Sequence, residues 1–261
     1  MTVVFFLVSF LASVVGAICG IGGGVIIKPV LDAANVCSVS TVSFLSGCTV
    51  LSMSCYSVGK ALIAGDSLVE FKTGTPLAAG AAIGGVVGKK LFSSLCSLSG
   101  NPDRVGTYQA ICLAIITAAT LLYVLRENRI RTHHLTSFPA CACIGLVLGL
   151  LSSFLGIGGG PVNLVVLYYF FSMSTKAAAQ NSLYIILISQ ITSLLTTLFT
   201  GTVPEFRFSW LILMVCGGIM GGMAGRVLNK RLQDQQVKRL FKCLMLLIIG
   251  ISCYNAVRFS F

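Results

Sequence analysis

Two stretches decide the fold of this chain: GAICGIGGG at residues 16–24 and LSSFLGIGGGPVN at residues 151–163. Both contain the run GIGGG, and both lie inside long apolar segments. Glycine adopts positive φ at little steric cost and lets another main chain or a ligand approach closely. In hydrocarbon, a non-helical stretch survives only where it is packed in protein or lines a cavity. The two runs therefore predict interrupted helices in the protein interior.

The composition around these runs is that of a membrane protein. Of 261 residues, 56% are hydrophobic and only 10% are charged, whereas soluble domains hold roughly 25% charged residues. A bilayer core about 30 Å thick requires around 20 apolar residues per helix, which leaves room for about seven or eight spans. The expected fold class is an all-α polytopic membrane protein without a sizeable soluble domain.

The net charge of +11 comes mostly from residues between the apolar segments. There, Lys and Arg orient a membrane protein and contact anionic lipid, so the expected partner is membrane lipid and not nucleic acid.

The N-terminal stretch MTVVFFLVSFLASVVGAI lacks a basic n-region. This favours a retained first helix over a cleaved signal peptide.

Neither a metal nor a cofactor is expected. Most of the eleven cysteines sit in apolar segments, without CxxC or Cys/His ligand spacing, and are interpreted as small core residues. The acidic residues all fall at segment ends or in loops, so none offers a carboxylate deep in the membrane: Asp32, Asp66, Glu70, Asp103, Glu127, Glu205 and Asp234. This disfavours cation transport and proton relays. An intramembrane enzyme is disfavoured too, because the only histidines lie in a loop.

Eight apolar segments follow one another along the chain, near residues 3–31, 39–63, 74–92, 105–125, 138–172, 177–200, 208–228 and 238–257. Three landmarks recur in the same order at nearly one spacing: GIGGG at 20 and 156, EFK at 70 and EFR at 205, GGVVGK at 84 and GGMAGR at 221. The pattern predicts two repeats of four segments, residues 1–131 and 132–261, forming one membrane domain. The first segment of each repeat is broken at GIGGG.

Whether the repeats are parallel or inverted depends on whether the broken segments cross the membrane or turn back. If all eight cross, the loops after the third and seventh segments share one side, which their cations mark as cytoplasmic: Lys89, Lys90, Arg104, Arg226, Lys230, Arg231, Lys238 and Arg239. Both termini then lie outside. Arg126, Arg129 and Arg131 would also lie outside, against the same rule.

Transporters built from two repeats bind substrate near the midplane, where discontinuous helices meet. An unwound stretch frees amide N–H groups, and the helix that restarts after it presents its positive end. Two such ends predict an anion site at six glycines: Gly22, Gly23, Gly24, Gly158, Gly159 and Gly160. Pro161 suits the first turn of a restarting helix, and Pro29 indicates a kink. The alternative is that glycines only permit tight helix crossing, which we favour for GGVVG at 84 and GGMAG at 221.

Lys28 lies one turn after the first break, inside an apolar run. It is either a substrate counter-charge, a snorkelling cation, or the partner of Asp32, four residues further on. At the predicted repeat shift, Ser46 matches Ser182 and Ser54 matches Gln190. These side chains, with Asn163 and Asn181, either form cross-helix hydrogen bonds or contact substrate. The candidate polar residues of the site are Lys28, Ser46, Asn163, Ser182 and Gln190.

At these residues the chain resembles the TauE/SafE family of sulfite and organosulfonate exporters, also called the toluene sulfonate uptake permease group. The resemblance spans the whole length. It rests on residues 20–24 followed by Pro29, on residues 156–160 followed by Pro161 and Asn163, and on the eight-segment duplication. Leu164 and Val165 stand where Lys28 and Pro29 stand in the first copy, so the two half-sites are unequal.

The resemblance implies a multi-pass transporter of the bacterial inner membrane. Its expected substrates are small sulfur-containing anions such as sulfite, sulfoacetate or related sulfonates. Export by alternating access around the paired glycine breaks is the leading interpretation. The alternatives are an uptake permease for a related organic anion and an accessory membrane subunit that transports nothing. The lack of central carboxylates favours a uniporter over proton antiport.

Overall fold

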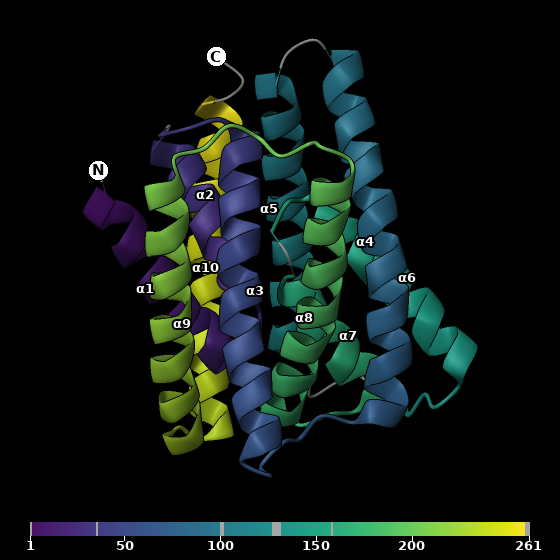
Figure 1. The fold of residues 1–261 in the computed structure, drawn as a ribbon. Helices are drawn as coiled ribbons and strands as arrows, with labels where there is room; N and C mark the ends of the chain where they lie inside the picture. Colours follow the sequence, from purple (N-terminus) through teal and green to yellow (C-terminus); the bar gives the residue numbers. More distant parts are fainter. Residues whose placement is uncertain (1, 35, 100–101, 127–131, 158, 259–261) are drawn as a thin grey trace.

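The structure, a computed structural model, describes residues 2–34, 36–99, 102–126, 132–157 and 159–258. These residues form helices and no strand (Figure 1). The helices are α1 (Thr2–Cys19), α2 (Gly24–Ala34), α3 (Val39–Ile63), α4 (Phe71–Ser99), α5 (Pro102–Arg126), α6 (Phe138–Phe154), α7 (Pro161–Phe171), α8 (Thr175–Phe199), α9 (Phe208–Arg231) and α10 (Asp234–Arg258).

Five helices in the described part of the chain are long and apolar enough to cross a membrane: α3, α5 from Gly106 onward, α8, α9 and α10. Shorter apolar helices cover Val3–Cys19, Phe138–Phe154 and Pro161–Phe171. The predicted all-α, multi-pass fold class is confirmed. The arrangement as eight segments in two repeats stays a prediction.

The first helix pair, α1 and α2, forms a hairpin. α1 ends at Cys19 and α2 begins at Gly24, and between them Gly20 and Gly22 have φ angles of 75° and 74°. At the start of α1, Phe5 stacks on Trp210 with 4.8 Å between ring centroids. Cys37, just after α2, packs against the same apolar cluster as Phe5. The chain therefore returns to the end from which it started.

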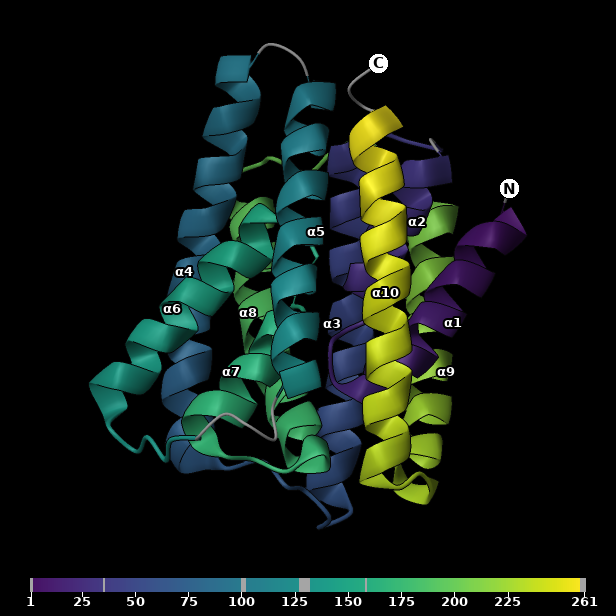
Figure 2. The same cartoon turned by 180° about the vertical axis from the view of Figure 1, so that it is seen from behind.

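The pair α6 and α7 forms a second hairpin. The main chain just before α6 is bonded to the last turn of α7, because His133 N donates to Tyr169 O at 2.8 Å and Leu135 N to Phe170 O at 2.9 Å. Pro161 occupies the first position of α7, as predicted. In Figure 2, α1 and α6 slant outward at opposite ends of the molecule. The two hairpins thus enter from opposite ends.

The long helices fix the direction of the chain. Thr41, near the start of α3, donates to Glu205 O, just before α9, at 3.0 Å. Near the ends of the same helices, Arg226 donates to Ser57 O at 3.1 Å. α3 and α9 therefore run in parallel. α8 runs the opposite way, because a short connection across the upper end in Figure 1 leads from it into α9.

Of the two alternatives for the broken segments, these directions favour segments that turn back over an arrangement in which all eight cross. Lys89 lies beside Thr197, near the end of α8, whereas Arg226 lies beside Asp66, just after α3. The two cations therefore lie at opposite ends of the molecule and not in loops that share a side. The physical reason is length: α2 and α7 have 11 residues each, about 16 Å at 1.5 Å per residue, half of a bilayer core.

Helix packing interleaves the two halves of the chain. α4 packs along α6 and α8, α9 packs along α1 and α3, and α10 packs on α5. The glycines at 84 and 221 form the close crossings expected of them, since a Cβ on Gly84 would strike Leu146 O of α6 and one on Gly221 would lie 2.5 Å from Phe10 O of α1. Both helix pairs depend on small residues for this contact.

The cysteines only partly follow their predicted core position. Cys19 and Cys141 are buried, whereas Cys55, Cys143 and Cys216 are among those exposed on the outer faces of the helices. The prediction is wrong for the exposed thiols because in a bilayer the lipid-facing surface is as apolar as the core. Hydropathy therefore does not distinguish the two places.

Candidate functional site

The main cavity lies between α3, α4, α6 and α8 and has a volume of about 270 Å³. It reaches the loop between α8 and α9, where Thr200 and Thr202 are exposed. The lining residues are Ser40, Ser43, Phe44, Gly47, Lys89, Lys90, Ser152, Ser153, Gly156, Gln190, Ser193, Leu194, Thr196, Thr197, Thr200, Thr202 and Pro204.

The lining of this cavity is basic and rich in hydroxyl groups. It contains two lysines, the Gln190 amide and a series of Ser and Thr hydroxyls, and no acidic residue among the described residues that border it. Lys89 Nζ donates to Ser193 O at 3.2 Å and also to the Thr197 hydroxyl. Ammonium, amide and hydroxyl donors without a competing carboxylate are suited to an anion.

The inner end of the cavity reaches the second glycine run. Gly156, which has a φ of 66°, borders the cavity together with Ser43. A Cβ on Gly156 would lie 2.7 Å from the Ser43 hydroxyl and 3.1 Å from Lys28 Cε. The Lys28 side chain therefore lies directly behind the wall that Gly156 forms.

The two glycine runs touch each other, as their predicted role requires. A Cβ on Gly24 would collide with Ile157 O and lie 3.0 Å from the Ser46 hydroxyl, and one on Gly159 would lie 3.5 Å from Ile21 O. Among the described residues, however, none of the glycines predicted to bind substrate borders the main cavity: Gly22, Gly23, Gly24, Gly159 and Gly160. Gly158 lies outside the described residues.

Ile186 packs against the glycine runs from α8. Its side chain is the nearest group to a Cβ on Gly22, at 3.4 Å, and also the nearest to one on Gly159. Apolar packing thus covers part of the predicted anion site. A substrate role for these glycines stays a prediction.

The predicted polar residues separate into different places. Gln190 borders the main cavity, and Asn163 borders a small cavity beside Ser189. The Ser46 and Ser182 hydroxyls are buried, and each has no hydrogen-bond partner among the described residues. Whether any of them contacts substrate stays a prediction.

Two of the open alternatives can be compared directly with contacts in the structure. Lys28 Nζ and Asp32 Oδ2 form an ion pair at 2.8 Å, with side chains only 5% and 7% exposed. Asn181 bonds to a loop and not to another helix, because its amide donates to Leu68 O at 3.0 Å and accepts from Glu70 N at 3.0 Å. Asn181 therefore anchors the loop between α3 and α4.

Sequence reasoning missed the two cavity lysines and most of the hydroxyl lining. Lys89 and Lys90 follow the GGVVG run and were assigned to a loop at the membrane interface. The overlooked signal was the hydroxyl-rich end of α8, SLLTTLFTGT at residues 193–202. On a helix that spans lipid, such a set indicates a face turned toward protein or water.

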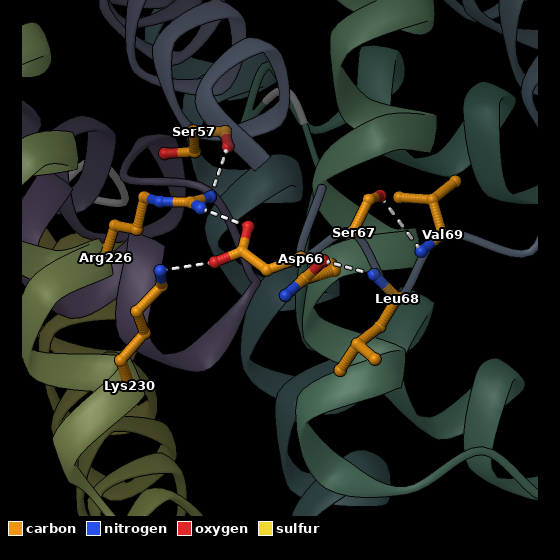
Figure 3. A network of polar contacts seen from close by, with 8 residues as sticks. Ser57, Asp66, Ser67, Leu68, Val69, Arg226 and Lys230 are labelled. Atoms are coloured by element: carbon orange, nitrogen blue, oxygen red, sulfur yellow. Dashed lines mark hydrogen bonds and ion pairs between the residues drawn. The ribbon is translucent and has the colours of Figure 1, made fainter. Parts of the chain in front are cut away.

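An ion-pair network lies at the end of the molecule opposite the main cavity (Figure 3). Asp66, in the loop after α3, pairs with Arg226 of α9 at 2.5 Å and with Lys230 of α9. Arg226 also donates to Ser57 O at 3.1 Å. Hydrogen bonds from Lys230 first, and then from Arg226, lower the pKa of Asp66. The network ties the α3–α4 loop to the second half of the chain.

A multi-pass helical bundle with a basic cavity at one end and an ion-pair network at the other is suited to a membrane transporter. The family profile described as "Sulfite exporter TauE/SafE" matches residues 5–252, and the chain belongs to this family. It is similar to the probable membrane transporter protein YunE of Bacillus subtilis (strain 168), with 23% identity over 273 residues, covering 94% of this chain and 95% of that protein. No solved structure matches it.

Proposed function

We propose that the protein transports small sulfur-containing anions, such as sulfite, sulfoacetate or related organosulfonates, and that it exports them. The observation that carries this proposal is the lining of the main cavity, with two lysines and many hydroxyls but no carboxylate among its described residues. The match to the sulfite exporter family supports the sulfur oxyanion as the substrate class.

The size of the cavity supports a small substrate. Its volume of about 270 Å³ lies just below the range of about 300–1,000 Å³ for pockets that take drug-sized ligands. A compact oxyanion accepts hydrogen bonds in several directions, and Lys89, Gln190 and Ser43 offer donors from three different helices. The cavity is thus suited to a tetrahedral or pyramidal oxyanion rather than to a long organic chain.

We infer that residues 1–131 and 132–261 are two repeats related by inversion. Helices α1 to α5 of the first repeat would correspond to α6 to α10 of the second. In support, Ser38 caps α3 by accepting from Thr41 N at 3.2 Å, and Ser174 caps α8 by accepting from Ala177 N at 3.4 Å. Inverted repeats with broken first helices are a recurring architecture of secondary transporters.

We propose that the end with the Asp66 network faces the cytoplasm of a bacterial inner membrane, and the distribution of basic residues supports this. At that end α3, α5 and α9 finish and α4, α8 and α10 begin (Figure 1), and the described basic residues in these parts of the helices are Lys60, Lys72, Arg126, Lys176, Arg226, Lys230, Arg231, Lys238, Arg239 and Lys242. The open end carries Lys89, Lys90, Arg207 and Arg258. Because cytoplasmic ends concentrate Lys and Arg, the cavity faces outward and both termini lie outside.

Transport by alternating access then requires the outer end to close and the cytoplasmic end to open. In the described state the outer end is open, and the Asp66 network closes the cytoplasmic end. Opening the cytoplasmic end requires these pairs to break while the α8–α9 loop closes over the cavity. The touching glycine runs provide the compact contact around which the halves move.

The test is flux of [³⁵S]sulfite in proteoliposomes containing the purified protein. Lys89→Met removes a charged donor, whose hydrogen bond contributes about 1.5–3 kcal/mol, so the apparent KM should rise by about 10 to 100-fold. Lys72→Met removes an exposed lysine at the other end of the same helix and should change little. Equal sulfite flux in protein-free liposomes, or equal kinetics of both variants, would contradict the proposal.

A further inference from the structure

A second, much smaller cavity lies beside the buried ion pair of α2. Its volume is about 10 Å³, close to the minimum for one water-sized occupant. It lies between α2, α5 and α10. Five of its polar side chains are 7% exposed or less: Lys28, Asp32, Gln109, Ser252 and Asn255.

The two amides at this cavity are oriented by the main chain. Gln109 Nε2 donates to Phe154 O at 2.6 Å, and Asn255 Nδ2 donates to Pro29 O at 2.9 Å. Each amide therefore keeps its oxygen as the remaining polar atom. Among the described residues, neither Gln109 Oε1 nor Asn255 Oδ1 has a hydrogen-bond partner.

Two more oxygens complete the set. Asp32 accepts from Lys28 through Oδ2, and its Oδ1 has no partner among the described residues. The same holds for Ser252 Oγ. One carboxylate, two amide oxygens and one hydroxyl, contributed by three helices, thus border a single small space. Unpaired buried polar atoms are rare in native structures and require an explanation.

We propose that this cavity binds a small monovalent cation of the Na⁺ type. Carboxylate, carbonyl and hydroxyl oxygens are the ligands of hard cations. Three of the oxygens carry no hydrogen and can only accept: Asp32 Oδ1, Gln109 Oε1 and Asn255 Oδ1. A single water can donate only two hydrogen bonds, so one of these acceptors would remain without a partner. A cation has no such limit, because it can be coordinated by every oxygen that borders the cavity. The site uses a single carboxylate, so its charge suits a monovalent rather than a divalent ion.

Lys28 connects this cation site to the main cavity. It borders the small cavity through its pair with Asp32, and its Cε lies behind Gly156. Leu155 borders the small cavity, and the next residue, Gly156, borders the large one. The two cavities therefore lie on either side of the same turn of the chain. A substrate anion at Gly156 attracts the Lys28 ammonium away from Asp32, and the cation replaces it there.

The buried charges explain why the two ions bind together, an argument that rests on the proposed function. Without ligands, Lys28 and Asp32 are neutral as a pair. With one monovalent anion and one cation the four charges again sum to zero. Either ion alone leaves a net charge in a low-dielectric interior, which is costly. Binding of the cation therefore couples to binding of the anion one to one. A cycle that carries both ions is electroneutral for a monovalent anion, and export then follows the combined gradients of the two ions.

The experiment measures melting of the full-length protein in detergent, with NaCl or choline chloride at equal ionic strength. A ligand that binds only the folded state raises the melting temperature. We expect a rise that saturates with Na⁺ and is larger in the presence of sulfite. Ser252→Ala removes one oxygen ligand, and since even outer partners of metal ligands contribute 10 to 100-fold in affinity, the half-saturating Na⁺ concentration should increase at least about tenfold.

The matched control is Thr117→Val. Thr117 lies on α5, is fully buried, has no hydroxyl partner among the described residues and borders neither cavity. The Thr117→Val substitution should leave the dependence of the melting temperature on Na⁺ unchanged. Equal melting in Na⁺ and choline would overturn the cation site. A Na⁺ response in a protein without sulfite flux would instead reject the proposed substrate and keep the site.

Discussion

The two ends of the molecule place corresponding residues in similar contacts, yet one end is closed and the other open. At the closed end, Arg226 of α9 donates to Ser57 O of α3. At the open end, Lys89 of α4 donates to Ser193 O of α8. The cations match in GGMAGR and GGVVGK, and the serines match at the shift between the two GIGGG runs.

One difference between the ends is a carboxylate. Asp66 pairs with Arg226 at the closed end, and the residue at the same shift on the open end is Thr202, which borders the cavity. A carboxylate close to the basic residue ties the loop to the helix and neutralises its charge. A threonine leaves the lysine to interact with an anion. The comparison leads to the prediction that this residue influences whether an end closes or receives substrate.

Moving the acid to the open end should have the largest effect. Thr202→Asp places a carboxylate at the cavity that holds Lys89, where it repels an oxyanion and competes for the ammonium. Because each charge-assisted hydrogen bond contributes about 1.5–3 kcal/mol, sulfite affinity should fall by about tenfold or more. Binding is measured by isothermal titration calorimetry of the purified protein. Thr202→Asn, of the same shape without charge, should lose much less; equal losses would argue against the comparison.

Removing the acid from the closed end should have a smaller effect. Asp66→Asn leaves Arg226 and Lys230 without their carboxylate, so amides of residues 64–70 should exchange hydrogen several-fold faster, a modest change typical of partly exposed pairs. Asn181 still anchors this loop through Leu68 and Glu70, which limits the change. Mass spectrometry measures the exchange. Glu70→Gln in the same loop serves as control, and unchanged exchange in Asp66→Asn would show that the pairs do not hold the loop.

The pH dependence of this closure should be the smallest effect. Lys230 and Arg226 lower the pKa of Asp66, so its pairs are fully present above the ordinary value near 4 and are lost as pH falls through the lowered value. Exchange of residues 64–70, corrected for its intrinsic pH dependence, should stay constant from about pH 7 to 5 and rise only below about 4. The rise should be absent in Asp66→Asn; a transition near neutral pH would contradict the assignment.

Much of the helix content could be predicted from the sequence, because helices in lipid leave a direct signature in hydropathy. The predicted ranges 39–63 and 177–200 lie close to α3 and α8. The close crossings at Gly84 and Gly221 followed from the spacing of small residues. The pairing of Lys28 with Asp32 was one of the alternatives that helical spacing allowed.

The direction of the chain could not be predicted, because hydropathy records depth in the membrane but not whether a segment continues or returns. The clue was in the length of the run that follows the first glycines, since α2 has only 11 residues. The burial of Asp32 was hidden for a related reason. It lies near a helix end, yet α2 ends against α10, where Asn255 donates to Pro29 O.

The candidate cavity was predictable only in its chemistry. An anion site was inferred from the glycine runs, but the described cavity reaches only Gly156 of them and takes its charge from Lys89 and Lys90. Which face of α4 turns inward depends on its crossing with α6 and α8. Such tertiary information is absent from a single sequence, whereas Gln190 was found because a buried amide requires a partner.

The most direct test of the central claim is a crystal of the protein soaked with selenite, which has the shape and charge of sulfite and scatters anomalously. The account predicts an anomalous peak in the main cavity, within hydrogen-bonding distance of Lys89 or Gln190 and close to Gly156. A peak between Gly22 and Gly159, with the main cavity holding no selenite, would contradict it.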